Sequence, residues 1–497
     1  MHNSLSSLIV KNLQINTKNI ISVKNNNKWI WKDSNYLIQS ISYCRDFLKS
    51  ENIEKGDRVA YKGSNSVEWI AWNMACNSLG AIWVPMYDNQ NQEYCNHIVN
   101  DCSPKLFITN PDTISNAKYK LNTKMINNNI EQSSNNQDYS FINNDISTLI
   151  YTSGTTGKPK GVMLSNENII TNINGINERY PDFKNKLSLN ILPWAHIYSQ
   201  TCELYYNILN DNKIAICSSR EEFIQELKEI QPHVLYVVPR VLELIKSKVE
   251  FLNKPIIQYI LPVVLKRVFG KNLKTIFVGG AKLQTTTRDF FQTNGYSICE
   301  GYGCTELSPI VSINHYENPR NEDSIGKVLD NVIVEIIEEE IQVSGPNVMK
   351  GYWNNPDETN KVLIERDNKI WYKTGDSGYL DNDFLFYSGR INDNYKLSNG
   401  KFVNIEEIES IVKHHVKCNC IVFTRDNINN ELIVSKEINE NTLNNINKEL
   451  NNYLKIKKTH LLEENKWEEY YTPKMSIKRK NLIHDFLRNY INNLIFL

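Results

Sequence analysis

The sequence lacks an excess of charge of either sign. Its 497 residues include 56 Lys and Arg and 56 Asp and Glu, so the formal net charge is zero. A nucleic-acid-binding protein needs a basic surplus to meet the phosphates, and we therefore expect no nucleic-acid partner. Hydrophobic residues make up 41% of the chain, which is enough for sizeable cores. A chain of this length is expected to divide into domains.

Long apolar segments are also missing. The sequence has no run of about 18 apolar residues, so we expect no membrane-spanning helix. Its start, MHNSLSSLIVKNLQIN, lacks the basic beginning and long apolar core of a secretory signal. We therefore predict a cytoplasmic protein, with peripheral contact to a membrane surface as an alternative. Residues 255–269, PIIQYILPVVLKRVF, would make that contact, although Pro262 favours a buried segment instead.

The 10 cysteines lack the spacing of a disulfide framework or a zinc site. They are scattered without CxxC pairs, and no set of His and Cys with zinc-ligand spacing accompanies them. We expect reduced thiols that act mostly as small buried apolar residues.

Helical periodicity alternates with short apolar runs in the first part of the chain. Residues 36–48 and 68–79 have the spacing of amphipathic helices, and residues 81–85 form an apolar run typical of a buried strand. This alternation predicts a parallel α/β layer. Residues 114–144 are rich in Asn, Ser, Lys and Gln, which predicts a poorly packed or partly disordered connection.

A segment rich in glycine and hydroxyl groups follows this connection. Residues 149–165 read LIYTSGTTGKPKGVMLS, an apolar lead-in followed by glycines, threonines, a serine and lysines. Glycine lets the backbone approach a ligand closely, and the hydroxyls and lysines favour an anion such as a polyphosphate. The segment is not a Walker A loop, because the GxxxxGK[ST] spacing is absent. An ordinary polar turn after a buried strand would use the same residue types.

This segment resembles the phosphate loop of the adenylate-forming (AMP-binding) superfamily. Later motifs recur in the family's order over roughly residues 28–480, namely LPWAH, KTIFVGG, CEGYGCTELSP, WYKTGDSGYL, YSGR and YKLSNGKFVNIEEIE. The last of these is most similar to long-chain fatty acyl-CoA synthetases. The resemblance implies an α/β fold with a large N-terminal domain, residues 1–390, of stacked α/β layers and a small β-barrel. Residues 391–497 would form a smaller, mobile C-terminal α+β lid.

The resemblance also implies the residues that bind ATP. Tyr302 would stack on adenine, and the Asp376 carboxylate would accept hydrogen bonds from both ribose hydroxyls. Adenine and ribose together would contact Gly280, Gly301, Tyr302, Gly303, Asp376 and Arg390. The phosphates would contact Thr152, Ser153, Gly154, Thr155, Thr156, Gly157 and Lys158.

Two residues of the CEGYGCTELSP motif are implied to take part in the chemistry. Thr305 would meet the α-phosphate, and Glu306 would hold Mg²⁺, which prefers one or two carboxylates together with phosphate oxygens. The acyl substrate would contact Trp194, His196 and Gly279. A core tryptophan and a histidine with its hydrogen bonds satisfied are the structural alternatives for the first two.

The resemblance places four features of the lid. Asn392 stands where the family has a hinge residue that is usually charged. Asn399, Gly400 and Lys401 would form a loop on the coenzyme A side, although NGK is also a common hairpin turn. The family's catalytic lysine falls on Ser476 in YTPKMSIKRK. Lys474 and Lys478 lie two residues away, and side chains two apart in an extended segment share a face, so either could substitute. A solvated basic surface is the alternative.

The activity implied by the resemblance is the ATP-dependent ligation of a fatty acid to coenzyme A through an acyl-adenylate. Mg²⁺ would be the cofactor, ATP and coenzyme A the co-substrates, and AMP and pyrophosphate the released products. One alternative is another acid:CoA ligase branch, for an aryl or medium-chain acid. The other is a nucleotide-binding pseudoenzyme of the same fold, which the serine at position 476 keeps open.

Overall fold

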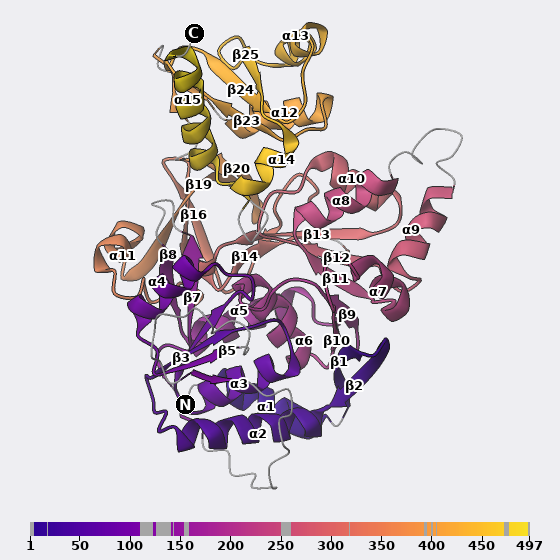
Figure 1. Ribbon diagram of the computed structural model, residues 1–497, viewed down its shortest axis with the longest axis vertical. Coiled ribbons are helices and arrows are strands. Elements are labelled where there is room, and N and C mark those ends of the chain that lie inside the picture. The colour runs from indigo at the N-terminus through magenta and orange to yellow at the C-terminus, as the bar shows by residue number, and fades with distance from the viewer. Residues whose placement is uncertain are drawn as a thin grey trace.

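The computed structural model describes residues 4–16, 18–109, 123–125, 141–142, 144–153, 159–249, 260–317, 319–391, 395–398, 401–403, 405–471 and 477–495. Figure 1 shows a large lower part built from most of the chain and a smaller upper part that carries the C-terminus. Two large sheets belong to the lower part, and a three-stranded sheet and a short hairpin to the upper part. The predicted fold class, α/β with a smaller C-terminal α+β unit, is confirmed.

The first sheet has six strands in the order β6-β5-β3-β4-β7-β8. All neighbours are parallel except β7 and β8, which are antiparallel. The strands are β3 (Arg58–Lys62), β4 (Ile82–Met86), β5 (Leu106–Thr109), β6 (Thr123–Met125), β7 (Thr148–Ser153) and β8 (Pro159–Leu164). The helices of this region are α1 (Leu5–Ile15), α2 (Ser34–Ser50), α3 (Val67–Ser78) and α4 (Gln92–Cys102).

The local sequence explains helix α3 and strand β4. The Ser66 hydroxyl accepts a hydrogen bond from the Trp69 N–H at 3.1 Å and so caps the start of α3. All five residues of β4 are buried, and the Trp69 ring meets the Trp83 ring edge to face at 5.4 Å. The two helices and the strand predicted in this region are thus confirmed as α2, α3 and β4. Most of the connection predicted at 114–144 lies outside the described residues, and its described part includes β6.

The second sheet runs β16-β17-β19-β20-β15-β14-β13-β12-β11-β9-β10-β1-β2, with β18 paired to β19. Its parallel strands are β1 (Asn19–Asn25), β9 (Leu187–Asn190), β10 (Lys213–Ile216), β11 (Val234–Val237), β12 (Thr275–Val278) and β13 (Ser297–Gly303). Antiparallel strands continue it: β2 (Lys28–Asp33), β14 (Ile310–Ile313), β15 (Lys327–Val328), β16 (Ile333–Ile337), β17 (Glu340–Ser344), β18 (Leu363–Arg366), β19 (Lys369–Asp381) and β20 (Phe384–Arg390).

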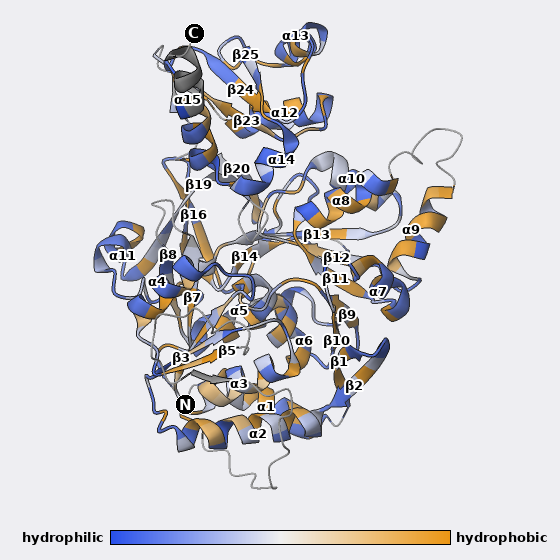
Figure 2. Cartoon of the chain, viewed as in Figure 1, coloured by the Kyte–Doolittle hydropathy of each residue, from blue (hydrophilic) through white to orange (hydrophobic). Residues whose placement is uncertain are grey.

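Two hydrophobic cores cover the faces of the parallel strands. Val234 and Tyr236 of β11 belong to one core, and Leu235 and Val237 belong to the other, as the alternation of a strand requires. Figure 2 shows the apolar colour along many of the inner strands and many polar residues along the surrounding helices. The helices on and around these faces are α5 (Asn166–Arg179), the π-helix Ser199–Tyr205, α6 (Tyr206–Leu209), α7 (Phe223–Ile230), α8 (Pro239–Val249), α9 (Leu261–Phe269), α10 (Thr285–Thr293) and, near β18, α11 (Pro356–Val362).

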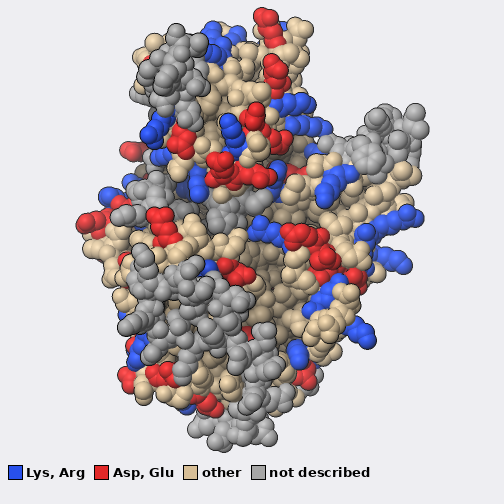
Figure 3. All heavy atoms as spheres, viewed as in Figure 1, with Lys and Arg blue, Asp and Glu red and all other residues tan. Residues whose placement is uncertain are grey.

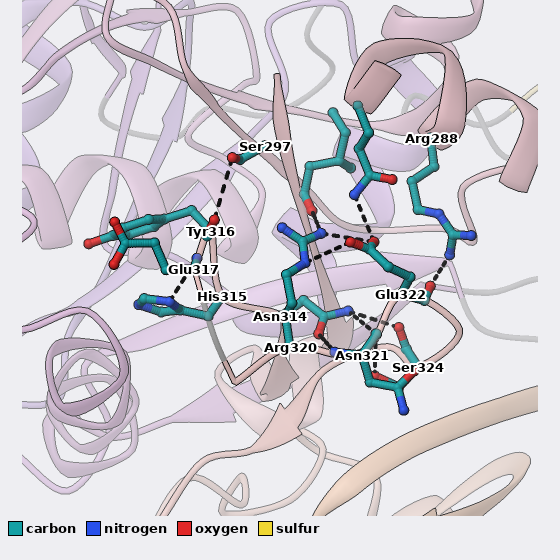
Figure 4. Close-up of polar contacts among 12 residues, drawn as sticks. Arg288, Ser297, Asn314, His315, Tyr316, Glu317, Arg320, Asn321, Glu322 and Ser324 are labelled. Atoms are coloured by element: carbon teal, nitrogen blue, oxygen red, sulfur yellow. Dashed lines mark hydrogen bonds and ion pairs between the residues drawn. The ribbon is translucent and has the colours of Figure 1, made fainter. Parts of the chain in front are cut away.

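The connection between β14 and β15 is fixed to β13 and α10 by polar contacts (Figure 4). The Arg320 guanidinium donates to the Ile298 carbonyl at 3.1 Å and forms an ion pair with Glu322 at 2.8 Å. Glu322 also accepts a hydrogen bond from the Gln292 amide at 2.7 Å. The Asn314 amide donates to the carbonyls of Asn321 and Ser324 at 2.9 and 3.0 Å. These contacts hold in place the strand that ends in the GYG sequence.

The C-terminal part has cores of its own. A hairpin of β21 (Tyr395–Lys396) and β22 (Phe402–Val403) precedes the sheet of β23 (Cys420–Phe423), β24 (Asn430–Val434) and β25 (Ile456–Leu461). Alternate strand residues again divide between two clusters, because Val422 faces α12 and Phe423 faces α15. The helices are α12 (Ile405–His415), α13 (Glu440–Glu449), α14 (Glu464–Trp467) and α15 (Arg479–Ile495). The boundary proposed at Arg390 coincides with the end of β20.

The structure can be compared with the expectations of no membrane-spanning helix and of reduced cysteines. Within the described ranges, no helix combines the length and the apolar character needed to cross a bilayer. In α9, Leu261, Leu265 and Phe269 are buried, and Pro262 occupies the first turn, where proline is tolerated. All ten cysteines are described, and each is a free thiol, as predicted.

Arg479 anchors the end of the segment that carries the lid lysines. Its guanidinium donates to both carboxylate oxygens of Glu409 at 2.7 Å, and the Glu409 carboxylate is almost fully buried. Arg479→Ala would leave this buried charge without its partner, so we expect a loss of about 3 kcal/mol in the unfolding free energy of the C-terminal part. Hydrogen exchange of the β23 and α12 amides, together with thermal unfolding, measures this loss of stability. Lys480→Ala, at an exposed neighbour, should change nothing, and equal effects of the two variants would contradict the assignment.

Candidate active site

The glycine-rich segment forms the connection between the antiparallel strands β7 and β8. Thr152 pairs with Lys160 in their register, and residues 154–158 between them lie outside the described residues. The Lys160 ammonium forms an ion pair with Glu358 at 3.0 Å and lies 4.5 Å from the centre of the Tyr352 ring. Lys160 is therefore paired within the protein, and the other lysine of the segment, Lys158, lies outside the described residues.

Glu306 lies next to the strand that leaves this loop. It belongs to the short 3₁₀ helix Thr305–Leu307, and Thr305 beside it is buried. The Tyr352 hydroxyl donates to Glu306 Oε1 at 2.9 Å, and Val162 of β8 forms a β-bridge with Tyr352. Tyr352 thus joins the phosphate-loop strand to the carboxylate expected to hold Mg²⁺.

Asp376 lies at the centre of the predicted adenine and ribose residues. The Tyr302 hydroxyl donates to its Oδ2 at 2.6 Å, and Arg390 Nε lies 2.9 Å from its Oδ1. The register of β19 and β20 explains the second contact, because it pairs Asp376 directly with Arg390. Burial raises the pKa of Asp376 to about 6, and the Arg390 guanidinium and the Tyr302 hydrogen bond oppose this rise.

The structure explains why two positions of the predicted nucleotide-binding set are glycine. A Cβ on Gly303 would lie 1.7 Å from the Pro309 carbonyl oxygen, so only glycine lets the two segments approach this closely. Gly280 adopts φ +84°, a conformation that side chains other than glycine rarely take. Both positions shape the backbone around Tyr302 and the cavity described next.

A cavity of about 200 Å³ lies between α7, α8 and the LPWAH segment. His196 and Gly280 line it, as do the aromatic rings of Tyr87, Tyr198 and Phe223. Apolar walls dominate, formed by Ile191, Leu192, Ile224, Val238, Val241, Leu244 and Ile245. The charged side chains of the lining are basic: Arg220, Arg240 and Lys248. An apolar acid would fit this combination of walls and charge.

Trp194 and Gly279 are placed differently from His196. The Trp194 side chain is fully buried, and its ring packs on Trp69 at 5.7 Å, so it lies in the core and does not line the cavity. The Tyr198 ring covers Gly279, because a Cβ there would meet the ring at 3.2 Å. Of the three predicted acyl contacts, the structure therefore brings His196 to the cavity wall, and Gly280 takes the place expected of Gly279.

The sequence analysis did not identify Tyr198 or Arg240 as residues of the cavity. Tyr198 directly precedes the π-helix Ser199–Tyr205, a rare type of helix that is often found at functional sites. Glu203 in this helix accepts hydrogen bonds from Asn190 at 2.6 Å and Ser199 at 3.0 Å, and burial raises the pKa of Glu203 to about 8. Glu203 is the one charged residue of this helix, and that charge was the signal available from the sequence.

The lid residues are only partly described. Asn392, Asn399, Gly400 and Lys474 lie outside the described residues. Lys401 is exposed, and its ammonium lies 4.7 Å from the Tyr453 ring of the same domain. Lys478 is also exposed, and its backbone N–H donates to the Tyr470 carbonyl at 2.7 Å.

Charges of both signs are interspersed over the face of the molecule shown in Figure 3. Basic and acidic groups meet where the C-terminal part faces the rest, and one such pair is Lys282 with Glu406 at 3.4 Å. The Lys282 ammonium also lies 6.0 Å from the Tyr387 ring, which in turn lies 6.0 Å from the Tyr302 ring. This chain of contacts connects the cavity residue Gly280, two positions before Lys282, with the Asp376 cluster.

The model of the family described as AMP-binding enzyme matches residues 36–353. Among relatives in sequence, long chain acyl-CoA synthetase 4 of Arabidopsis thaliana is 25% identical over 470 residues, covering 77% of this chain and 70% of the relative. A long-chain-fatty-acid–CoA ligase of Bacillus subtilis is 31% identical over 286 residues, covering 54% of this chain and 48% of the relative.

Solved structures share the fold over almost the whole chain. The ATP-bound MatB of Rhodopseudomonas palustris superposes with a TM-score of 0.81 at 20% identity, covering 97% of this chain and 99% of that one. The O-succinylbenzoate coenzyme A synthetase MenE of Bacillus subtilis, in complex with AMP, gives a TM-score of 0.79 at 20% identity, covering 96% and 97%.

If Asp376 binds the ribose as predicted, its raised pKa should make nucleotide binding depend on pH. With a pKa of about 6, the carboxyl loses its negative charge at lower pH and becomes a weaker hydrogen-bond acceptor, so MgATP affinity should fall as the pH is lowered from 7.5 to 5. Asp376→Asn should weaken binding at pH 7.5 by about 1–3 kcal/mol and flatten the pH profile. Calorimetric titration measures both. Asp381→Asn, an exposed carboxylate at the end of the same strand, serves as the control, and a pH profile unchanged by Asp376→Asn would exclude the ribose role.

Proposed function

Because the chain belongs to the family of AMP-binding enzymes, we propose that it ligates a fatty acid to coenzyme A through an acyl-adenylate. The observation that carries the proposal is an apolar cavity beside a polar cluster that can bind a nucleotide. Gly280 and His196 line the cavity, and Tyr302, Asp376 and Arg390 form the cluster. An enzyme that joins an apolar acid to AMP needs these two environments side by side.

The proposed reaction has two steps. A carboxylate oxygen of the acid forms a bond to the α-phosphorus of ATP, and the bond to the β-phosphate oxygen breaks, which releases pyrophosphate. The thiol sulfur of coenzyme A then bonds to the acyl carbon and loses its proton, and AMP leaves with the electrons of the broken acyl–oxygen bond. Orientation of the two substrates and stabilisation of the developing charge supply the catalysis.

Individual residues have distinct roles in this proposal. Tyr302 stacks on adenine within the GYG backbone of Gly301 and Gly303, while Asp376 and Arg390 hold the ribose. Thr305 contacts the α-phosphate. The β- and γ-phosphates lie in the loop formed by Thr152, Ser153, Gly154, Thr155, Thr156, Gly157 and Lys158. The loop of Asn399, Gly400 and Lys401 takes the coenzyme A side after rotation at Asn392, and Lys474 or Lys478 supplies the charge missing at Ser476.

The residues present fit a magnesium ion that is held largely by substrate. Within the described ranges, no cluster of three or more His, Cys, Asp or Glu side chains exists that could hold a metal by itself. Mg²⁺ prefers one or two carboxylates with phosphate oxygens, and Glu306 offers such a carboxylate. When bound, the ion would neutralise charge on the phosphates.

The proposed substrate is a long-chain acid. The relatives named long-chain acyl-CoA synthetases and the apolar walls of the cavity support this choice. An aryl acid is the second candidate, because Tyr87, Tyr198 and Phe223 bring three aromatic rings to the same cavity. Leu244 of α8, which lines the cavity, and Val263 of α9 are exposed apolar residues, and they support peripheral contact with a membrane that supplies the acid.

Glu306→Gln tests the metal role. The substitution removes the charge and keeps the volume, so we expect ATP–pyrophosphate exchange to fall by roughly 10²-fold or more while the fold is retained. Partial recovery at high Mg²⁺ is expected, because only one of several ligands changes. Exchange assayed over a Mg²⁺ titration, with circular dichroism as a check of folding, measures this. Glu365→Gln, at an exposed carboxylate, should behave as wild type, and normal exchange in Glu306→Gln would remove Glu306 from the metal site.

The rate of AMP formation with acids of different length tests the whole proposal. Each methylene buried in the cavity contributes about 0.8 kcal/mol, so kcat/KM should rise along acetate, hexanoate, decanoate and palmitate until the cavity is full. Benzoate and cinnamate are assayed in parallel as aryl acids. A preference for the aryl acids would select the second candidate. Absence of AMP formation with every acid, alongside normal ATP binding, would favour the pseudoenzyme.

A further inference from the structure

Arg240 borders both the acyl cavity and the C-terminal domain. It stands in the first turn of α8, directly after β11, and lines the cavity between Val238 and Val241. Its guanidinium carbon also lies 5.9 Å from the centre of the Tyr471 ring, which belongs to the C-terminal domain. The Arg240 side chain therefore contacts both the cavity proposed for the acid and the segment that leads to the lid lysines.

The hydrogen-bonding capacity of Arg240 is only partly used. One nitrogen lies 3.9 Å from the Glu243 carboxylate, a turn further along α8. Its Nε is buried and has no acceptor in the part of the chain that the structure describes. A buried N–H without an acceptor is unfavourable, so an anionic group that reached this position would be bound well.

A second contact between the domains also starts from the cavity wall. Gly280 lines the cavity, and Lys282, two residues further on, forms the 3.4 Å ion pair with Glu406. Glu406 lies in the first turn of α12. Both contacts thus connect the C-terminal domain to segments that line the proposed acid cavity or lie next to its lining residues.

We propose that Arg240 couples the binding of the acid to the position of the C-terminal domain, an inference that rests on the proposed function. The carboxylate of the acid, entering beside His196 and Gly280, competes with the Tyr471 ring for the Arg240 guanidinium. A charge-assisted hydrogen bond is stronger than a cation–π contact at a partly exposed site, so the acid displaces the ring. Linkage then requires the reverse effect: docking of Tyr471 weakens acid binding.

This competition predicts effects of opposite sign for the two partners. Arg240→Ala removes a ligand of the acid and should raise its KM roughly tenfold, and Arg240→Lys should restore part of the loss. Tyr471→Leu removes the competitor and should lower the KM about threefold. Tyr471→Phe keeps the ring and should match wild type. Arg267→Ala, at an exposed residue of α9, controls for loss of a positive charge.

Hydrogen exchange gives a readout that does not depend on turnover. Addition of decanoate alone, without ATP or coenzyme A, should raise exchange in residues 464–471 of the wild type. In Arg240→Ala, exchange there should already be high and should not respond to the acid. A purely structural role of Arg240 would predict lower stability without this loss of response.

The possible results separate the two proposals. If the wild type forms AMP from a fatty acid but Arg240→Ala and Tyr471→Leu shift the KM in the same direction, the coupling is wrong and the activity stands. The same holds if the acid leaves exchange at residues 464–471 unchanged in an active wild type. If no acid supports AMP formation or alters exchange, the proposed function fails, and the coupling fails with it.

Discussion

The ion pair and hydrogen bond around Asp376 are the contacts on which the rest of the site depends. A single carboxylate joins Tyr302 at the end of β13 to Arg390 at the end of β20, two strands that the sheet order separates by β14 and β15. Its burial carries a cost that appears as a raised pKa, and the two partners offset that cost. The same three side chains connect β13 to β20, the last strand before the C-terminal domain.

Much of this arrangement could be predicted because motifs and strand ends coincide in the sequence. Asp376, Arg390 and Tyr302 lie in short sequence motifs at or near strand ends. The pairing of these strands in the sheet brings the three side chains together. The alternation of apolar runs and helices likewise predicted α2, α3 and β4. The sequence left two roles open where burial decides between them: Trp194 stands in the same motif as His196, yet it packs in the core against Trp69.

The apolar cavity was harder to predict for a physical reason. Its walls come from residues far apart in the chain, among them Tyr87, Tyr198 and Val241, and none of them carries a spacing that marks a ligand. Arg240 follows a buried strand and reads as a helix-start residue, so its contact with Tyr471 depends on how two domains meet. Contacts between domains leave little trace in local periodicity.

Cys304 lies between Gly303 and Thr305, at the centre of the predicted reaction site. Burial raises the pKa of its thiol well above the usual value, and the nearby carboxylates of Glu306 and Asp376 add to the rise. Only the thiolate of a cysteine is a good nucleophile, so this sulfur is chemically quiet. An activated acyl group formed here would persist until an external thiol arrived, and the protein would escape acylation of its own side chain.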